Sequence, residues 1–195
     1  MTTVATILQG PTKYLKNLGL YYDYLGTIVS TWENEEIDHG WCFEVIKNKI
    51  PSNPGIGNLN MQTVSTTAGL KLAKRYGFTH AFKIRSDIYF SDYDKLLRNL
   101  DYTKLNFLCY HTHDGGYLVD YICFGPIDEM LLYWDYYSED YSRPADVQLS
   151  NKYLKNTDKK VSYILPILLK ENIDAIWIKK GINLRDYAKD PLFTY

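Results

Sequence analysis

Cysteine is scarce in this sequence, and the cysteines present do not form a recognisable metal or disulfide pattern. Cys42, Cys109 and Cys123 are odd in number and far apart, and no C-x-x-C pair occurs. Disulfide-rich secreted domains and structural zinc sites need paired cysteines at short, regular spacing. The sequence therefore suggests neither kind of site, and it favours a reducing compartment.

Long hydrophobic runs and an excess of charge of one sign are also missing. The most apolar stretches, such as YILPILL, are far shorter than the roughly 20 residues that span a bilayer. The start, MTTVATILQGPTKYL, lacks the basic-then-apolar pattern of a signal peptide. The 22 Lys and Arg residues balance 23 Asp and Glu residues, which argues against a nucleic-acid surface. We expect no transmembrane segment, no nucleic-acid partner and a cytoplasmic location, with peripheral membrane association left open.

Three motifs of common nucleotide and hydrolase sites do not occur. The sequence has no G-x-x-x-x-G-K-[ST], no G-x-G-x-x-G after its first predicted strand, and no G-x-S-x-G. These absences exclude a P-loop and a dinucleotide fingerprint, and they weigh against a serine hydrolase.

Tyrosine, in contrast, is abundant, with 19 residues. A tyrosine combines a flat apolar face with a hydroxyl group, which suits pockets for polyols and bases. Genome composition explains the same number equally well. The length of 195 residues, 46% of them hydrophobic, corresponds to one domain large enough to bury a core.

Strands and helices alternate in the first half of the chain. TVATIL, LGTIVSTW and, more weakly, WCFEVIKNKI are typical of strands. Residues 58–77 show helical spacing, with Asn58 or Asn60 as N-cap and Gly77 as the stop. THAFKI is the next strand, after which Ser91 is expected to cap a short helix. This alternation predicts a parallel sheet with right-handed crossovers.

The second half has a more mixed pattern. LNFLCYH and YLVDYICFG, joined at HDGG, predict an antiparallel hairpin. Helices are expected around 126–138, 145–156 and 161–172, followed by the strand DAIWIKK and an irregular tail. The predicted fold is α/β, with a mostly parallel mixed sheet that has an antiparallel edge and helices on both faces.

Polar loops follow three of the predicted strands: QGPT, STWENE and RSD. In open α/β sheets, ligands bind at the carboxyl ends of the strands, where the strand order reverses. A carboxylate there, such as Asp87, can hold a divalent cation, and the neighbouring Arg85 can bind phosphates or fix that carboxylate. The alternative is a plain salt bridge at the start of a capped helix.

Several segments together resemble a known family. ILQGPT, STWENE, NLNMQTVSTTAGLKLAK and FKIRSDIYF, in this order and spacing, resemble the WavE-type lipopolysaccharide-synthesis proteins, which look like GT-A-type glycosyltransferases. YLVDYICFGPIDEMLLYW resembles a later segment of the same family. The resemblance covers about residues 4–135 well and the remainder loosely. It implies a GT-A-like, Rossmann-type fold in one domain, with about 1–100 binding the nucleotide-sugar and about 101–195 binding the acceptor.

The resemblance also implies a donor site. The matching positions are Gln9, Gly10, Pro11, Thr31, Glu33, Asn60, Gln62, Arg85 and Asp87. The first three would line the nucleotide pocket, although a plain turn explains them too, and the next two would lie close to the base or ribose. The two amides would lie at a helix start, where anions and hydroxyls are favoured. Met61 stands where the family usually has a basic residue, which removes one candidate phosphate contact.

The same resemblance implies a metal and a catalytic carboxylate. Arg85 stands where GT-A enzymes usually have the first acid of Asp-x-Asp, so Asp87 is the expected ligand of Mn²⁺ or Mg²⁺. The missing acid leaves open whether Arg85 supplies the positive charge instead. Asp120 and Asp146 are the candidate catalytic residues, because an inverting transfer needs a carboxylate to take the acceptor proton. A solvent-facing strand position and an ordinary helix N-terminal charge are the respective alternatives.

Three further segments have two interpretations each. HTHDGG predicts a hairpin tip rather than a metal site. Residues 185–187 are candidates for a lid over the diphosphate. Leu131, Trp134 and Tyr137 have helical spacing, which favours core positions over a platform for an acceptor sugar.

The sequence as a whole predicts a glycosyltransferase that moves a sugar from a UDP- or GDP-sugar donor to a glycan acceptor. One alternative is a non-catalytic nucleotide-sugar or glycan-binding module with the same fold. Another is a nucleotidyltransferase, which would need a basic Gly-rich loop near the N-terminus, where QGPTKYLK offers only Lys13 and Lys16.

Overall fold

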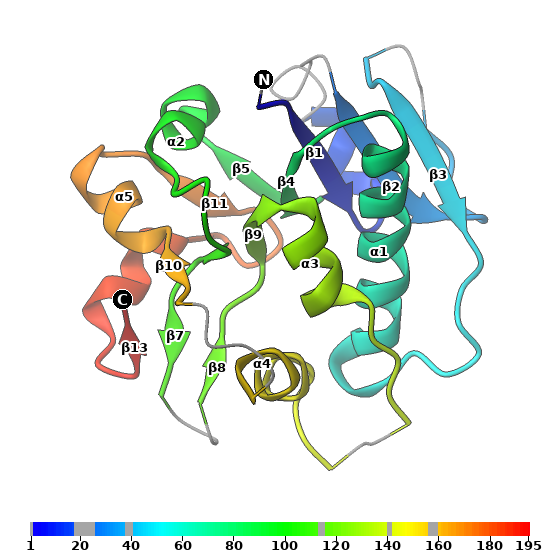
Figure 1. The fold of residues 1–195 in the computed structure, drawn as a ribbon. Helices are drawn as coiled ribbons and strands as arrows, with labels where there is room; N and C mark the ends of the chain where they lie inside the picture. Colours follow the sequence, from blue (N-terminus) through cyan, green and yellow to red (C-terminus); the bar gives the residue numbers. More distant parts are fainter. Residues whose placement is uncertain (1, 18–25, 38–40, 113–115, 140–141, 156–159) are drawn as a thin grey trace.

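The computed structural model describes residues 2–17, 26–37, 41–112, 116–139, 142–155 and 160–195. In these residues a seven-stranded sheet has the order β10-β6-β9-β4-β1-β2-β3 (Figure 1). Its strands are β1 (Val4–Gln9), β2 (Thr27–Trp32), β3 (Glu44–Asn48), β4 (His80–Arg85), β6 (Asn106–Phe107), β9 (Ile122–Pro126) and β10 (Ser162–Tyr163).

Two three-stranded sheets and a set of helices complete the described structure. One sheet contains β12 (Ile182–Asn183), β11 (Ala175–Trp177) and β5 (Ile88–Phe90), and the other contains β13 (Phe193–Thr194), β7 (Tyr110–His111) and β8 (Tyr117–Leu118). The α-helices are α1 (Leu59–Arg75), α2 (Tyr93–Asn99), α3 (Ile127–Trp134), α4 (Ala145–Lys155) and α5 (Leu165–Lys170). Three 3₁₀ helices are η1 (Thr12–Asn17), η3 (Ile56–Asn58) and η4 (Leu184–Lys189).

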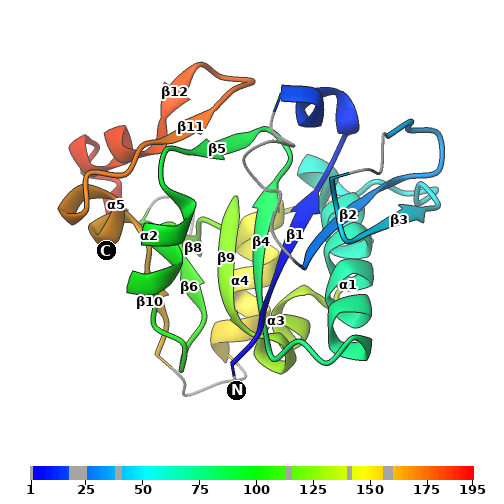
Figure 2. The same ribbon diagram turned by 90° about the horizontal axis from the view of Figure 1, so that it is seen from above.

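Helices cover both faces of the main sheet, as the sequence predicts (Figure 2). The α1, α3 and α4 helices bury one core against residues such as Ile7, and α2 and α5 bury the other against residues such as Leu8. Both of these neighbouring side chains in β1 are fully buried. A strand that is buried on both sides reads as a continuous apolar run, which is why TVATIL lacks polar alternation.

The sheet is mixed and mostly parallel. β1 pairs in parallel with β2 and β4, β2 with β3, and β10 with β6. β9 is antiparallel to both β4 and β6, so it lies inside the sheet. The expectation of an antiparallel edge is therefore wrong. β9 pairs with β4 from His80 opposite Pro126 to Ile84 opposite Ile122. The shorter β6 pairs with the other side of β9.

The predicted hairpin is confirmed in two pieces. β6 pairs with β9, and β7 pairs with β8 in the smaller sheet, both antiparallel. His111 stacks on Tyr117, with ring centroids 4.7 Å apart. His113 and Asp114, at the expected tip, lie outside the described residues.

Two helix boundaries test the capping predictions. Gly77, with φ of 83°, follows the end of α1 as expected. At α2 the predicted cap is wrong, because the Asp92 carboxylate accepts the Lys95 backbone N–H at 2.9 Å. Ser91 instead exchanges hydrogen bonds with Asp174, its hydroxyl accepting the backbone N–H of that residue at 2.9 Å. Ser91 therefore pairs with the segment that leads into β11 instead of capping α2.

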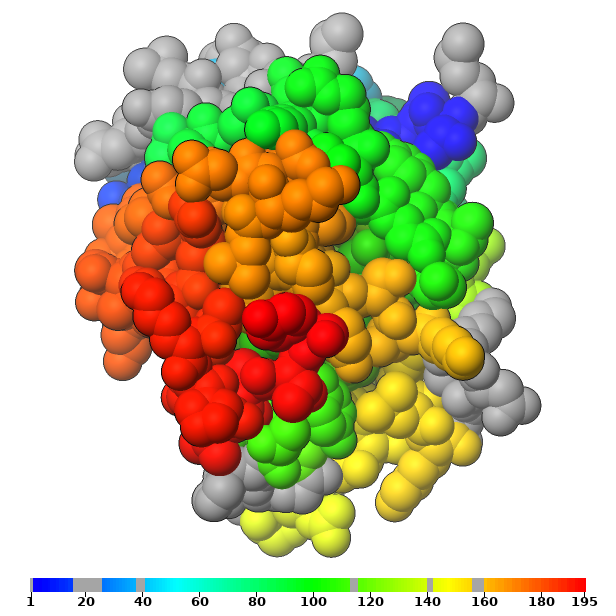
Figure 3. Space-filling model, turned by 90° about the vertical axis from the view of Figure 1, so that its left-hand side faces the viewer, coloured from blue at the N-terminus to red at the C-terminus, as the bar shows by residue number. Residues whose placement is uncertain are grey.

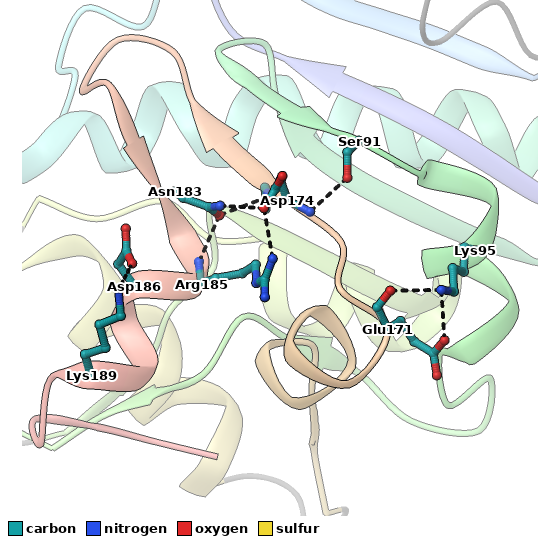
Figure 4. A network of polar contacts seen from close by, with 9 residues as sticks. Ser91, Lys95, Glu171, Asp174, Asn183, Arg185, Asp186 and Lys189 are labelled. Atoms are coloured by element: carbon teal, nitrogen blue, oxygen red, sulfur yellow. Dashed lines mark hydrogen bonds and ion pairs between the residues drawn. The ribbon is translucent and has the colours of Figure 1, made fainter.

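The C-terminal segment is more regular than the sequence predicts. β11 pairs antiparallel with β5 and β12, and η4 and β13 follow. At the base of the β11–β12 hairpin, the Asp174 carboxylate accepts hydrogen bonds from Asn183 at 2.7 Å and Arg185 at 3.0 Å (Figure 4). Figure 3 shows residues 160–195, in orange and red, covering one side of the molecule next to the green α2. These contacts hold the two strands of the hairpin together, and the pairing of β11 with β5 attaches the hairpin to the rest of the fold.

Among the described residues, no helix combines the length and the apolar character needed to cross a membrane. Strands from both halves of the chain share the main sheet.

Candidate functional site

A polar cavity lies at the point where the strand order of the main sheet reverses. From β1 the chain adds β2 and β3 on one side and then β4 on the other, so the reversal falls between β1 and β4. Gln9 and Arg85 end these two strands in register. The loops that follow them line a cavity of about 190 Å³. This is the position at which open α/β sheets bind their ligands.

Most of the predicted donor-site residues line this cavity. Its wall includes Gln9, Gly10, Pro11, Gln62, Arg85 and Asp87. The end of η3 and the first turn of α1 also line the cavity, and Gln62 is the predicted amide that does so. The carboxyl ends of β1 and β4 and the beginning of α1 thus meet at one place.

Thr31 and Glu33 do not line the cavity. Thr31 is fully buried in β2, and Trp32 faces the cavity in its place. Successive side chains of a strand point to opposite faces, so only one of two neighbours can reach the site. Glu33 is exposed, whereas the Glu35 carboxylate accepts hydrogen bonds from the backbone N–H and hydroxyl of Thr12, at 3.0 and 2.5 Å.

Asn60 has a structural position rather than a ligand-facing one. Its side chain is fully buried, accepts the backbone N–H of Ser138 at 2.9 Å and donates to the carbonyl of the same residue at 2.7 Å. Asn58, the N-cap of α1, is left-handed with φ of 62° and makes no capping bond with its side chain. Asn60 therefore ties the start of α1 to the segment after α3.

The loops after β1 and β4 approach each other closely at Gly10. Its φ of 123° lies in the region that favours glycine, and a Cβ at this position would lie 2.9 Å from the Ser86 hydroxyl oxygen. The backbone N–H of Ser86 donates to the carbonyl of Gln9 at 2.8 Å. A glycine here lets two loops meet without a side chain between them.

Arg85 and Asp87 form a two-point ion pair in the cavity wall. Arg85 Nε and Nη2 donate to the two oxygens of Asp87, each at 2.9 Å, and the Trp177 indole N–H donates to Asp87 Oδ2 at 2.8 Å. The guanidinium carbon lies 4.8 Å from the centre of the Trp177 ring. Burial would raise the pKa of the Asp87 carboxyl, but the bonds and charge of Arg85 and the indole bond outweigh it and hold that pKa below its ordinary value.

This geometry does not fit the predicted metal site. Both oxygens of Asp87 are already bonded, and its side chain is only 5% exposed. Within the described part of the chain, no group of three or more His, Cys, Asp or Glu residues is placed to hold a metal ion. Mn²⁺ and Mg²⁺ need oxygen ligands that are free to coordinate. Asp87, the one predicted ligand, would have to break its ion pair with Arg85 to coordinate a metal ion.

Two lysines that the sequence did not assign complete the cavity wall. Lys13 comes from η1 directly after β1, and Lys179 comes from the turn between β11 and β12. With Arg85 they give three cations against a single acid, Asp87, in the lining that the structure describes. The lining therefore carries a net positive charge.

Asp120, between β8 and β9, is fully buried beside Lys83 of β4, so a solvent-facing position is wrong. Lys83 Nζ donates to the Asp120 backbone carbonyl at 2.8 Å, and the Tyr133 hydroxyl donates to Asp120 Oδ2 at 3.3 Å. Asp120 Oδ1 has no hydrogen-bond partner in the described structure. Burial raises the pKa of the Asp120 carboxyl, and the charge of Lys83 partly opposes this effect. Burial also lowers the pKa of Lys83 to about 8.

Asp146 lies in the first turn of α4, as expected. Burial raises the pKa of the Asp146 carboxyl well above its ordinary value, and the negative charge of Asp120 adds to this effect. The helix begins close to the cavity, because a Cβ built on Gly57 would lie 3.6 Å from the Ala145 Cβ, and Gly57 lines the cavity. The start of α4 therefore lies next to the polar pocket, but neither Asp120 nor Asp146 belongs to the described lining.

Two predictions concern the surface of the site. Arg185 and Asp186, two of the three residues of the expected lid, form ion pairs with Asp174 and Lys189 (Figure 4), and the lid stays a prediction. Lys179, from the preceding turn, reaches the cavity. Trp134 is buried in the core as expected, but Tyr137 is 49% exposed.

Sequence signals existed for some of the residues that were missed. Lys83 interrupts the apolar run HAFKIR, and a lysine is seldom fully buried without a partner. The two lysines of WIKKG stand before a glycine, which is typical of a turn. No local pattern connects that turn to the cavity.

No protein-family model matches this chain, and no curated protein matches its sequence. The likeness to WavE-type proteins stays a prediction, and the geometry of the cavity carries the functional argument.

Proposed function

We propose that this protein is a glycosyltransferase with a GT-A-like fold, which moves a sugar from a UDP- or GDP-sugar to a glycan acceptor. The observation that carries the proposal is the cationic cavity at the reversal of strand order between β1 and β4. Nucleotides bind at this point of open α/β sheets, with their phosphates close to backbone N–H groups and positive charge.

The size of the cavity indicates which part of the donor it takes. Its volume of about 190 Å³ is below the roughly 300–1,000 Å³ of pockets that enclose a whole ligand. Its cations suit a diphosphate, and Gly10 allows the backbone to approach one closely. The diphosphate therefore occupies the cavity, and the sugar and the base extend beyond it.

Two carboxyls, the fully buried Asp120 and the half-buried Asp146, support a catalytic role on the side of the cavity that faces α4. In the proposed reaction, Asp146 takes the proton of the acceptor hydroxyl as its oxygen bonds to the anomeric carbon of the donor sugar. The bond from that carbon to the diphosphate oxygen breaks, and the nucleoside diphosphate leaves with the bonding electrons. Asp120 acts through Asp146, because its negative charge raises the pKa of that group toward the working range of a general base.

Donor hydrolysis tests the proposal without knowledge of the acceptor. A panel of UDP- and GDP-sugars is incubated with the protein, and release of UDP or GDP is measured. We expect slow turnover of one donor and a loss of about 10²–10⁴-fold in Asp146→Asn. Asp128, in the first turn of α3 and exposed, provides the matched control Asp128→Asn, which keeps the rate.

Two outcomes would contradict an enzyme of this kind. Nucleotide binding without turnover of any donor would favour the non-catalytic binding module, which the poor fit for a metal also supports. Turnover that is unchanged in Asp146→Asn would remove this residue from the reaction.

A further inference from the structure

We infer that the diphosphate of the donor is held by the protein's own cations, Lys13, Arg85 and Lys179, in place of a divalent metal ion. The inference rests on the proposed function, because it concerns how the same cavity binds its donor. It reverses the metal dependence that the resemblance to GT-A enzymes implies.

Asp87, the only predicted metal ligand, has both of its oxygens bonded. Its two oxygens receive three hydrogen bonds at 2.8–2.9 Å, two from Arg85 and one from Trp177. Trp177 cannot easily withdraw, because it pairs with Ile88 of β5 and Ile182 of β12 in the smaller sheet. Coordination of a metal would therefore break a charged pair and leave a buried indole N–H without an acceptor.

Arg85 keeps N–H donors for a ligand. A guanidinium has five N–H donors, and the bonds to Asp87 use only Nε and Nη2. The group is also held in place, since its carbon lies 4.8 Å from the centre of the Trp177 ring and 5.6 Å from that of Tyr121. An arginine that is fixed by a carboxylate on one edge can present its other edge to a phosphate.

Within the described residues, the two lysines of the cavity wall differ from several other lysines in having no acidic partner. Lys71, Lys74, Lys95 and Lys189 pair with carboxylates. In the described part of the chain, neither Lys13 nor Lys179 has such a pair, and both line the cavity. A lysine on a flexible stem is a mobile point charge that suits a phosphate.

The two lysines reach the cavity from separate elements. Lys13 belongs to η1, and Lys179 to the turn of the β11–β12 hairpin; both elements lie beyond the carboxyl end of β1 and β4 (Figure 2). The bonds of Asp174 to Asn183 and Arg185 anchor the base of that hairpin (Figure 4). Asp87 neutralises one of the three cations, so the net positive charge that remains matches a negatively charged diphosphate.

Calorimetric titration in EDTA and in Mn²⁺ tests the inference. UDP and GDP are titrated into the wild type, Lys13→Met, Lys179→Met and Lys180→Met. We expect one nucleotide to bind with the same Kd, within about twofold, in EDTA and in Mn²⁺. Each of the first two variants weakens binding by roughly tenfold. Lys180→Met removes a neighbouring charge of the same turn that does not line the cavity, and it leaves the Kd unchanged.

Three results would overturn the inference, and the first two leave the proposed function standing. Binding that needs Mn²⁺ and is lost in Asp87→Asn would restore the metal and keep the donor site. An equal loss in Lys179→Met and Lys180→Met would reduce the lysines to a general charge effect. If neither nucleotide binds in EDTA or in Mn²⁺, the inference and the proposed function both fail. All three lysines are exposed, so unfolding of these variants is not expected, and circular dichroism checks this.

Discussion

Arg85 and Asp87, separated only by Ser86, face each other through two hydrogen bonds of 2.9 Å, and both belong to the wall of the same cavity. A pair of acids at this position would attract a cation. A guanidinium that binds a carboxylate blocks both carboxylate oxygens and keeps only its remaining N–H donors available for a ligand. The chemistry expected of the site therefore depends on the presence of an arginine, rather than a second acid, at position 85.

The ion pair also stabilises the fold. Arg85→Met leaves the Asp87 carboxylate buried without its charged partner, a change that typically costs about 3–5 kcal/mol in the free energy of unfolding. Because the Arg85 side chain is 24% exposed, we expect the lower end of this range. The double variant Arg85→Met, Asp87→Asn removes the unpaired charge and recovers part of the loss. Urea denaturation measures all three proteins.

The pH dependence of this stabilisation has a definite sign. The pKa of Asp87 is lower in the folded protein than in the unfolded chain, so the pair contributes fully above the unfolded value of about 3.9. The contribution is lost as the pH falls through the lower folded value. The stability difference between wild type and Arg85→Met should therefore shrink in acid. A difference that stays constant from neutral pH into strong acid contradicts this explanation.

Lys83 should make stability rise with pH in the alkaline range. Its pKa of about 8 is below the ordinary 10.5, so between these values the unfolded chain binds more protons and the folded state gains as the pH rises. Relative to Lys83→Met, we expect the wild type to gain about 2 kcal/mol between about pH 7 and about pH 9.5. Lys74→Met, exposed on α1, is the control for loss of charge. If the free energy of unfolding changes with pH in the same way for wild type and Lys83→Met, this prediction is wrong.

Gly10 should matter for the ligand as well as for stability. Gly10→Ala adds a strained backbone at φ of 123° and a contact with Ser86, costing about 1–3 kcal/mol and weakening nucleotide binding. Gly77→Ala adds strain at φ of 83° in open space, so it lowers stability but keeps the affinity. Urea denaturation and titration with UDP or GDP compare the two. Equal nucleotide affinity in both variants would show that the loops need not meet at Gly10.

The pH profile of sugar transfer should report the pair of carboxyls. Asp146 has to be ionised to accept a proton, so kcat/KM should rise with pH through its raised pKa. Asp120→Asn removes the charge that raises this pKa and should move the rise to lower pH, whereas a purely structural role of Asp120 would leave its position unchanged. A profile that Asp120→Asn does not move speaks against the coupling.

Local patterns predicted the parts of the fold that depend on short segments. The apolar runs around Ile7 and Ile84 became central strands, and Gly77 ends α1 because only a residue that tolerates positive φ fits there. The polar loops after β1 and β4 meet because parallel neighbours end at the same edge of a sheet. The positions of Gln9 and Arg85 follow from this rule alone.

Contacts between distant segments explain the errors. Asp87 is bonded to Trp177, ninety residues later in the chain, which no pattern near RSD could indicate. Lys179 reaches the cavity only because β11 pairs with β5. The insertion of β9 beside β4 and the burial of Asp120 against Lys83 depend on the same kind of long-range pairing.

The most direct test of the central claim is a crystal structure of the protein grown with UDP or GDP in the presence of EDTA. We predict a diphosphate in the cavity between β1 and β4, with Lys13, Arg85 and Lys179 within hydrogen-bond distance of its oxygens and the Arg85–Asp87 pair intact. A nucleotide bound elsewhere would contradict the site. A diphosphate that appears only in crystals grown with Mn²⁺, bridged to Asp87 by the metal, would contradict the role of the protein's cations.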